Sequence, residues 1–163
     1  MEYLFLDIDG VLNDHKKLET GFCGIQNDKA SLLNEFLDTH KEVKIVVSSA
    51  WRYMILEEEM TIKGFEYLLV VSGLKCLNKI VGCTREDAKL DESRLTQIED
   101  WLNTKEYTNF IIIDDLELNS PNQIKTDGKL GFTKKDLEKA NELMVYLRSK
   151  TEVDLLGPPP DFT

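Results

Sequence analysis

Long hydrophobic runs are missing from this 163-residue sequence, and no apolar stretch approaches the ~20 residues that a membrane-spanning helix needs. The start, MEYLFLDIDG, carries acids where a secretory signal has a basic region and a longer apolar stretch. We therefore expect a cytoplasmic protein, or one delivered to another cell's cytoplasm by an unseen signal. The length predicts one domain over residues 1–150, followed by a proline-rich tail over residues 151–163.

Cysteine and positive charge are both scarce. Cys23, Cys76 and Cys83 lack C-x-x-C spacing and a neighbouring histidine cluster, which argues against a zinc site or a disulfide framework and favours buried thiols. Twenty basic residues against 30 acidic ones give a net charge of -10. An acidic surface repels a polyanion unless a local basic patch overrides it, so the charge disfavours nucleic acid as a partner. The sequence does not fix the oligomeric state, and we expect a monomer.

Unbroken apolar runs alternate with helical patterns along the chain. The runs at 3–6, 45–47, 68–71 and 110–113 are typical of strands buried on both faces of a parallel sheet. Apolar stripes at helical spacing predict three helices, with these candidate caps: Asn27 or Asp28, Asp91 or Ser93, and Thr133 with Asp136. The alternation predicts an α/β, three-layer Rossmann-like fold with a mainly parallel central sheet flanked by helices.

Acidic residues follow two of the predicted strands. Asp7 and Asp9 come directly after the first run, beside Gly10, which permits a tight turn or a close backbone approach. Asp114 and Asp115 follow the last run. In such sheets ligands bind at the carboxyl ends of the strands, and carboxylates paired there cost electrostatic free energy unless a cation or a shared proton compensates. The sequence therefore predicts an oxygen-rich site for Mg²⁺ at this edge.

Hydroxyl groups follow the second predicted strand, in the segment SSAWR at residues 48–52. Hydroxyls and backbone N–H groups at a strand's end can hold an anion, although a serine pair there is also a common helix cap. Ser48 and Ser49 are both candidates for binding a phosphate oxygen.

The order of these segments, DIDGVLN, SSAWR, a basic residue at a helix start and IIIDD, resembles the haloacid dehalogenase (HAD) phosphatase superfamily over roughly residues 3–133. It is most similar to small capless members with an SSxWR segment and an R-x-x-Q/E-I-x-x-W-L helix, which reads RLTQIEDWL at 94–102. The segments 13–26 and 72–91, where this family inserts caps, are too short for a separate cap domain. The resemblance thus implies an open site without a cap.

The resemblance implies a role for each acid. Asp7 is the nucleophile that forms an aspartyl-phosphate, and Asp9 is the general acid and base. Magnesium is held by Asp7, the backbone carbonyl of Asp9 and Asp115, while Asp114 assists from beside Asp115. Because Asp9 is present, the resemblance implies hydrolysis of phosphate monoesters rather than dehalogenation.

The remaining roles concern the phosphoryl group. Ser48 is expected to hydrogen-bond a phosphoryl oxygen, and Arg94 to place positive charge against it. Three other basic residues in the same stretch could replace Arg94: Arg85, Lys75 and Lys79. Further substrate-binding residues are expected at these positions: Gly10, Ser49 and Arg52. His15 could contact the substrate or lie in a solvated loop.

The acidic surface favours a phosphoprotein, including one with phosphotyrosine, or a small phosphoester as the substrate. Two alternatives stay open: a nucleic-acid end phosphatase of the RNA or DNA repair type, and a receiver-like phosphate-binding switch without enzymatic activity. The C-x5-R motif of cysteine phosphatases and the P-loop of kinases are both missing. A degenerate binding module is disfavoured because the catalytic positions are intact.

Overall fold

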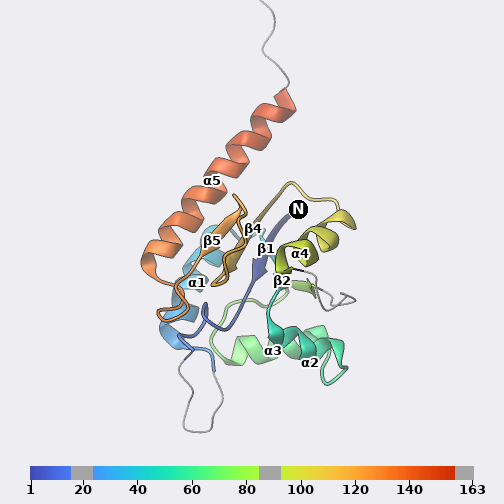
Figure 1. The fold of residues 1–163 in the computed structure, drawn as a ribbon, viewed down its shortest axis with the longest axis vertical. Coiled ribbons are helices and arrows are strands. Elements are labelled where there is room, and N and C mark those ends of the chain that lie inside the picture. Colours follow the sequence, from blue (N-terminus) through green and yellow to red (C-terminus); the bar gives the residue numbers. More distant parts are fainter. Residues whose placement is uncertain (16–23, 85–92, 157–163) are drawn as a thin grey trace, which may run out of the picture.

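The computed structural model of the chain describes residues 1–15, 24–84 and 93–156 (Figure 1). Its elements follow in this order: β1 (Glu2–Leu6), α1 (Asn27–Thr39), β2 (Lys44–Val47), the 3₁₀ helix η1 (Ala50–Arg52), α2 (Tyr53–Leu56), α3 (Ile62–Val71), β3 (Ile80–Cys83), α4 (Arg94–Asn103), β4 (Asn109–Asp114), β5 (Gln123–Lys125) and α5 (Lys134–Leu156). No helix among these residues is long and apolar enough to cross a membrane.

The strands form one parallel sheet in the order β3-β2-β1-β4-β5. The register pairs Leu6 of β1 with Val47 of β2 and with Ile113 of β4, so these three strands end level with one another. Residues that follow them therefore meet at one edge. The predicted α/β fold with a parallel central sheet is confirmed.

Helices cover both faces of the sheet. On one face, alternate strand residues such as Phe5, Val46 and Ile112 pack with Ile98 and Leu102 of α4. The other face forms the larger core with α1, α3 and α5, as the opposite positions of α4 and α5 in Figure 1 show. Burial of these apolar side chains is the main favourable contribution to folding, and it fixes the strand ends relative to α4.

Helix caps agree in part with the prediction. Thr133 and Asp136 form the expected capping box, since the Asp136 N–H donates to Thr133 Oγ1 (3.3 Å) and the Thr133 N–H to Asp136 Oδ2 (2.9 Å). Ser93 caps α4 by accepting the Thr96 N–H at 3.2 Å. For α1 the prediction was wrong by one residue, because Gln26 occupies the cap position and no side chain caps the helix.

The run at 68–71 was predicted as a strand and is the end of helix α3. Thr61 caps this helix by accepting the Gly64 N–H at 3.0 Å, and Phe65 and Leu69, four residues apart, are both fully buried. The third strand is instead β3, whose sequence IVGC contains Gly82. A Cβ there would lie 3.5 Å from the ring of Trp101, so glycine at this position lets Trp101 pack against the strand. The strand pattern of this short, glycine-containing segment was too weak for the sequence to predict a strand there.

The predicted domain boundary at residue 150 lies within α5, which continues to Leu156 and extends past the sheet (Figure 1). Residues 157–163, the proline-rich end, lie outside the described part. Cys76 and Cys83 are buried as predicted, and Cys23 also lies outside it.

Candidate active site

The candidate site lies where β1, β2 and β4 end side by side. Backbone bonds extend the sheet by one residue: the Asp7 N–H donates to the Ile113 carbonyl at 3.0 Å, and the Ser48 N–H to the Leu6 carbonyl at 2.9 Å. Successive strand residues alternate between faces, so Asp7, Ser48 and Asp114 occupy the α4 side of this edge. The fold thus brings together the first motif, the serine segment and the second acid pair.

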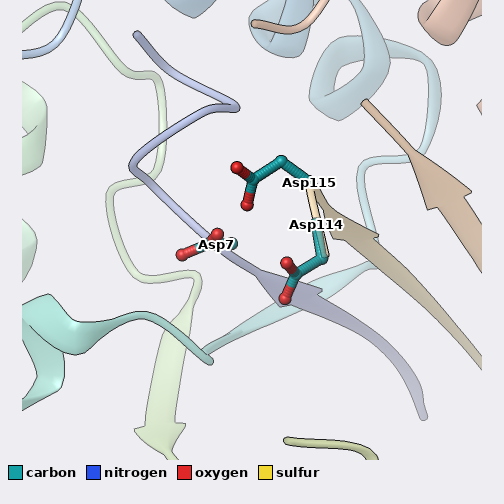
Figure 2. Close-up of side chains that lie close together, drawn as sticks. All are labelled: Asp7, Asp114 and Asp115. Carbon is teal, nitrogen blue, oxygen red and sulfur yellow. The ribbon is translucent and has the colours of Figure 1, made fainter. Parts of the chain in front are cut away.

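Three carboxylates gather at this edge, from Asp7, Asp114 and Asp115 (Figure 2). Each offers one oxygen, and these oxygens all lie within 4.8 Å of one another. Burial and the charge of Asp114 raise the pKa of Asp7 to about 7, and burial also raises the pKa of Asp114. Buried carboxylates with raised pKa values suit a hard divalent cation such as Mg²⁺, which would relieve the repulsion between them.

Arg94, the first residue of α4, supplies positive charge to the cluster. Its Nη1 lies 2.7 Å from Asp114 Oδ2 and 3.1 Å from Asp7 Oδ2. The two described alternatives lie before β3, towards the opposite edge: Lys75 Nζ is 3.2 Å from a carboxylate oxygen of Asp38, and Lys79 donates to a backbone carbonyl. Arg85 lies outside the described residues. Of the candidates that the structure describes, Arg94 alone contacts the acids.

The acids of the second pair have different surroundings. Asp114 uses both oxygens within the protein, since Oδ1 accepts the Leu116 N–H at 2.9 Å and Oδ2 accepts from Arg94. Asp115 is less buried, and its Oδ2 lies 3.0 Å from Nε2 of His15. Asp115 is therefore the better placed of the two to hold a cation, while Asp114 orients Arg94.

Asp9 lies outside the carboxylate cluster. Its Oδ1 accepts from Asn13 Nδ2 at 3.0 Å and its Oδ2 from Trp51 Nε1 at 3.1 Å. Asn13 Oδ1 also accepts the Gly10 N–H at 3.0 Å, and Gly10 has a φ of +80°. The loop after β1 is thus folded around Asn13, which holds the Asp9 carboxylate in place. Sequence reasoning assigned no role to Asn13 or Trp51, although both lie within the quoted motifs.

Two buried hydroxyls at this edge have no hydrogen-bond partner among the described residues. One is Oγ of Ser48, and the other is Oγ1 of Thr84, which follows β3 next to β2. Ser49 differs, since its Oγ accepts the Trp51 N–H at 3.3 Å as a helix cap. An unpartnered buried hydroxyl costs free energy that an oxyanion ligand would recover, so the contacts favour Ser48 over Ser49. Thr84 was not predicted, because the third strand had been placed elsewhere.

Arg52 was predicted to bind substrate, but its described contacts point into the protein. It is 4% exposed, and it donates to the Ser49 carbonyl at 2.9 Å and to Gln97 Oε1 at 3.3 Å. These bonds tie the serine segment to α4. The described contacts of Arg52 thus lie between the segment that carries Ser48 and the helix that begins with Arg94.

In a comparison with protein families, the family model for the HAD domain in Swiss Army Knife RNA repair proteins matches residues 3–137. No curated protein and no solved structure matches the chain. The matched range begins in β1 and ends in the first turn of α5, so it contains the sheet and the whole edge described above. The chain therefore belongs to the family of HAD domains found in Swiss Army Knife RNA repair proteins.

Proposed function

We propose that this HAD-type hydrolase is a magnesium-dependent phosphatase that cleaves phosphate monoesters through an aspartyl-phosphate on Asp7. One observation carries the proposal: a buried carboxylate, an unpartnered buried hydroxyl and a guanidinium meet at the carboxyl edge of the sheet. Asp7 supplies a nucleophilic oxygen, while Ser48 and Arg94 supply donors for the oxygens of a phosphoryl group.

The reaction proceeds in two displacements. An Asp7 oxygen attacks phosphorus, the bond to the leaving oxygen breaks, and Asp9 gives that oxygen a proton. In the second step Asp9 takes a proton from water, whose oxygen attacks phosphorus and releases Asp7 and inorganic phosphate. The hydrogen bonds from Asn13 and Trp51 hold the Asp9 carboxylate outside the carboxylate cluster. The Asp9 side chain therefore need not bind the metal and can transfer protons.

Charge at phosphorus is neutralised by this chain's own residues and by the proposed metal. Asp7 and Asp115, with the backbone carbonyl of Asp9, would hold Mg²⁺, which when bound neutralises phosphoryl charge. Arg94 contacts both Asp7 and Asp114. A phosphoryl group bound at Asp7 would therefore lie within reach of the guanidinium. Asp114 keeps the guanidinium in position.

We propose the phosphorylated end of a nucleic acid as the substrate class, supported by the RNA repair proteins that give the matching family its description. This proposal differs from the prediction made from the net charge of -10, which disfavoured nucleic acid as a partner. That charge supports a second candidate, a phosphoprotein or a small phosphoester. The cytoplasmic location and the monomeric state stay predictions of the sequence.

The test is a kinetic assay of the purified chain on p-nitrophenyl phosphate, with Mg²⁺ and with a chelator. We expect turnover that needs Mg²⁺ and that Ca²⁺ supports poorly, because calcium's larger coordination shell fails to hold in-line geometry. Full activity in chelator would contradict the metal assignment. A stable phosphoryl group on Asp7 without turnover would favour the receiver-like switch instead.

A further inference from the structure

A hollow of about 450 Å³ adjoins the carboxylate cluster, and nothing above assigns it a function. It shares Asp115 with the cluster and is otherwise lined by the segment that follows β5: Lys125, Thr126, Asp127, Gly128 and Lys129. The hollow therefore adjoins Asp115, the acid proposed to hold the metal. It has room for a part of the substrate beyond the terminal phosphate.

Lys125 lies level with Asp7, the proposed nucleophile, across the neighbouring strands of the sheet. The register pairs it with Asp114, which in turn is level with Asp7, so Lys125 lies two strand spacings, about 10 Å, from β1. It is exposed, and it lies on the α4 side of the sheet together with Asp7 and Asp114. A lysine at this position can reach a charge that is bound next to the phosphoryl group on Asp7.

The loop that carries Lys129 is fastened to the site. Thr126 Oγ1 donates to the Gly10 carbonyl at 2.7 Å, which ties the end of β5 to the loop after β1. At Gly128 an added Cβ would lie 2.7 Å from Asp115 Oδ2, so the loop backbone packs directly against the acid. The Lys129 N–H donates to Asp127 Oδ1 at 2.9 Å within a closed turn. The hollow thus has a fixed position relative to the nucleophile.

Some lysines of this acidic protein are paired with acids, whereas Lys125 and Lys129 are not in the part of the chain that the structure describes. Lys29, Lys63 and Lys75 each form an ion pair with a carboxylate. Within residues 1–15, 24–84 and 93–156, neither Lys125 nor Lys129 has an ion-pair or hydrogen-bond partner for its ammonium group. Asp115 and Asp127 line the same hollow, so its formal charges balance. A cation held by Asp115 would offset that carboxylate, and the two ammonium groups would then outnumber the remaining acid on a surface whose net charge would otherwise repel a polyanion.

We propose that Lys125 and Lys129 bind a second phosphate of the substrate, the phosphodiester next to the terminal monoester. This rests on the proposed phosphatase function and deepens it, since it selects a polynucleotide end over a small phosphoester or a singly phosphorylated peptide. The terminal phosphate occupies the edge at Asp7, Ser48 and Arg94, and the adjoining diester occupies the hollow. Charge–charge contacts with a flexible strand give affinity that falls as salt rises.

The test compares two double variants that each remove two positive charges. Lys125→Gln/Lys129→Gln changes the hollow, and Lys41→Gln/Lys150→Gln removes exposed lysines between α1 and β2 and on α5. Both are assayed on a 3′-phosphorylated hexanucleotide and on p-nitrophenyl phosphate. For the first variant we expect kcat/KM on the hexanucleotide to fall about tenfold, with a change below about twofold on the aryl phosphate. The control should change below twofold on both.

Salt dependence gives a second readout. Losing two contacts to a single strand should make the slope of log kcat/KM against log salt shallower by about 1.4, and the control should leave it unchanged. Equal losses on both substrates, a loss in the control, or no loss would overturn the proposal. So would an equal loss on a phosphopeptide with a single phosphate, because the lysines would then attract any large substrate.

The failure of the phosphatase function is separable from the failure of this proposal. If the wild type cleaves neither substrate, the proposed function is wrong. Fluorescence anisotropy of the labelled 3′-phosphorylated hexanucleotide then decides the second site. About tenfold weaker binding by Lys125→Gln/Lys129→Gln, but not by the control, would support it. Equal binding by both variants would overturn it.

Discussion

Charged side chains cluster both at the amino edge of the sheet, where the strands begin, and at the carboxyl edge, where they end, but their surroundings differ. At the amino edge, Glu2 accepts two hydrogen bonds from Arg148, at 2.9 and 2.7 Å. The Arg148 guanidinium also lies 3.0 Å from Nδ1 of His40. The hydrogen bonds from Arg148 lower the pKa of Glu2. At the carboxyl edge three carboxylates lie close together, the Arg94 guanidinium contacts two of them, Asp7 and Asp114, and the pKa of Asp7 is raised to about 7.

The difference separates a structural cluster from a functional one. The amino edge satisfies its charges within the protein, so its ionised form stabilises the fold. The carboxyl edge leaves negative charge and the Ser48 hydroxyl uncompensated, so it destabilises the fold until a cation and an anion bind. Mutations at the two edges should therefore have opposite effects on activity and on stability.

The largest expected effect is on turnover by Asp7→Asn. The amide cannot form the phosphoryl ester, so kcat on p-nitrophenyl phosphate should fall by roughly 10⁴-fold or more. Steady-state kinetics in saturating Mg²⁺ measures this, and circular dichroism checks the fold. Glu2→Gln, at the amino edge, is the matched control and should keep wild-type kcat. Wild-type turnover by Asp7→Asn would exclude the aspartyl-phosphate mechanism.

Asp9→Asn should have the next largest effect. Loss of positioned proton transfer should lower turnover of alkyl phosphates by about 10²–10⁴-fold. The loss should be smaller on aryl phosphates, because a nitrophenolate leaves without a proton. Affinity for Mg²⁺, measured by calorimetry, should stay nearly unchanged, since the side chain contacts Asn13 and Trp51 outside the cluster. Equal losses on both substrates with weak metal binding would show that the Asp9 side chain is a metal ligand.

Most of the carboxyl edge could be predicted from sequence because each residue there follows a continuous strand pattern. Asp7, Ser48 and Asp114 come directly after buried apolar runs, and parallel strands place such residues together. The failures have physical causes. The run at 68–71 is apolar enough for a strand, and only the burial of Phe65 and Leu69 at helical spacing shows that it is a helix.

Contacts between distant segments were beyond sequence reasoning. Asn13 and Trp51 hold Asp9 from positions 4 and 42 residues away, and nothing in a linear pattern reports the second of these. The buried hydrogen bond from Arg52 to Gln97 was likewise not predictable, because it depends on how α4 packs against the serine segment. The amino edge was also not predicted, because Glu2 and Arg148 are 146 residues apart.

A smaller effect is expected on the stability of the metal-free protein. The pKa of Asp7 is raised from 3.8 to about 7, so the protonated form favours folding, and stability is lost as pH rises from about 4 to about 7. Asp7→Asn removes this dependence and should be more stable than wild type at pH 8 by up to a few kcal/mol. Urea unfolding in chelator at pH 5 and pH 8 measures it. A variant that is less stable than wild type at pH 8 would contradict the prediction.

The smallest effect is expected at the amino edge. A lowered pKa means that ionised Glu2 contributes stability above its unfolded value of 4.5, and that this contribution is lost as pH falls through the folded value. Solvent reaches the Arg148 side chain, which is 38% exposed, so the coupling between Glu2 and Arg148 should be about 1 kcal/mol. A double-mutant cycle with Glu2→Gln and Arg148→Met measures it by urea unfolding at pH 7.

The Asp28–Lys29 pair provides the control for this cycle, because the Asp28 side chain is 70% exposed and its coupling should be close to zero. The Glu2–Arg148 coupling should shrink as pH falls through the lowered pKa of Glu2, where that carboxylate takes up a proton. All amino-edge variants should keep kcat within about twofold, since their contacts lie across the sheet from Asp7. A coupling no larger than that of the exposed pair would show that the Glu2–Arg148 pair does not stabilise the fold. A lost kcat in the amino-edge variants would show that the two edges are not separate in function, because charge at one would then be required for chemistry at the other.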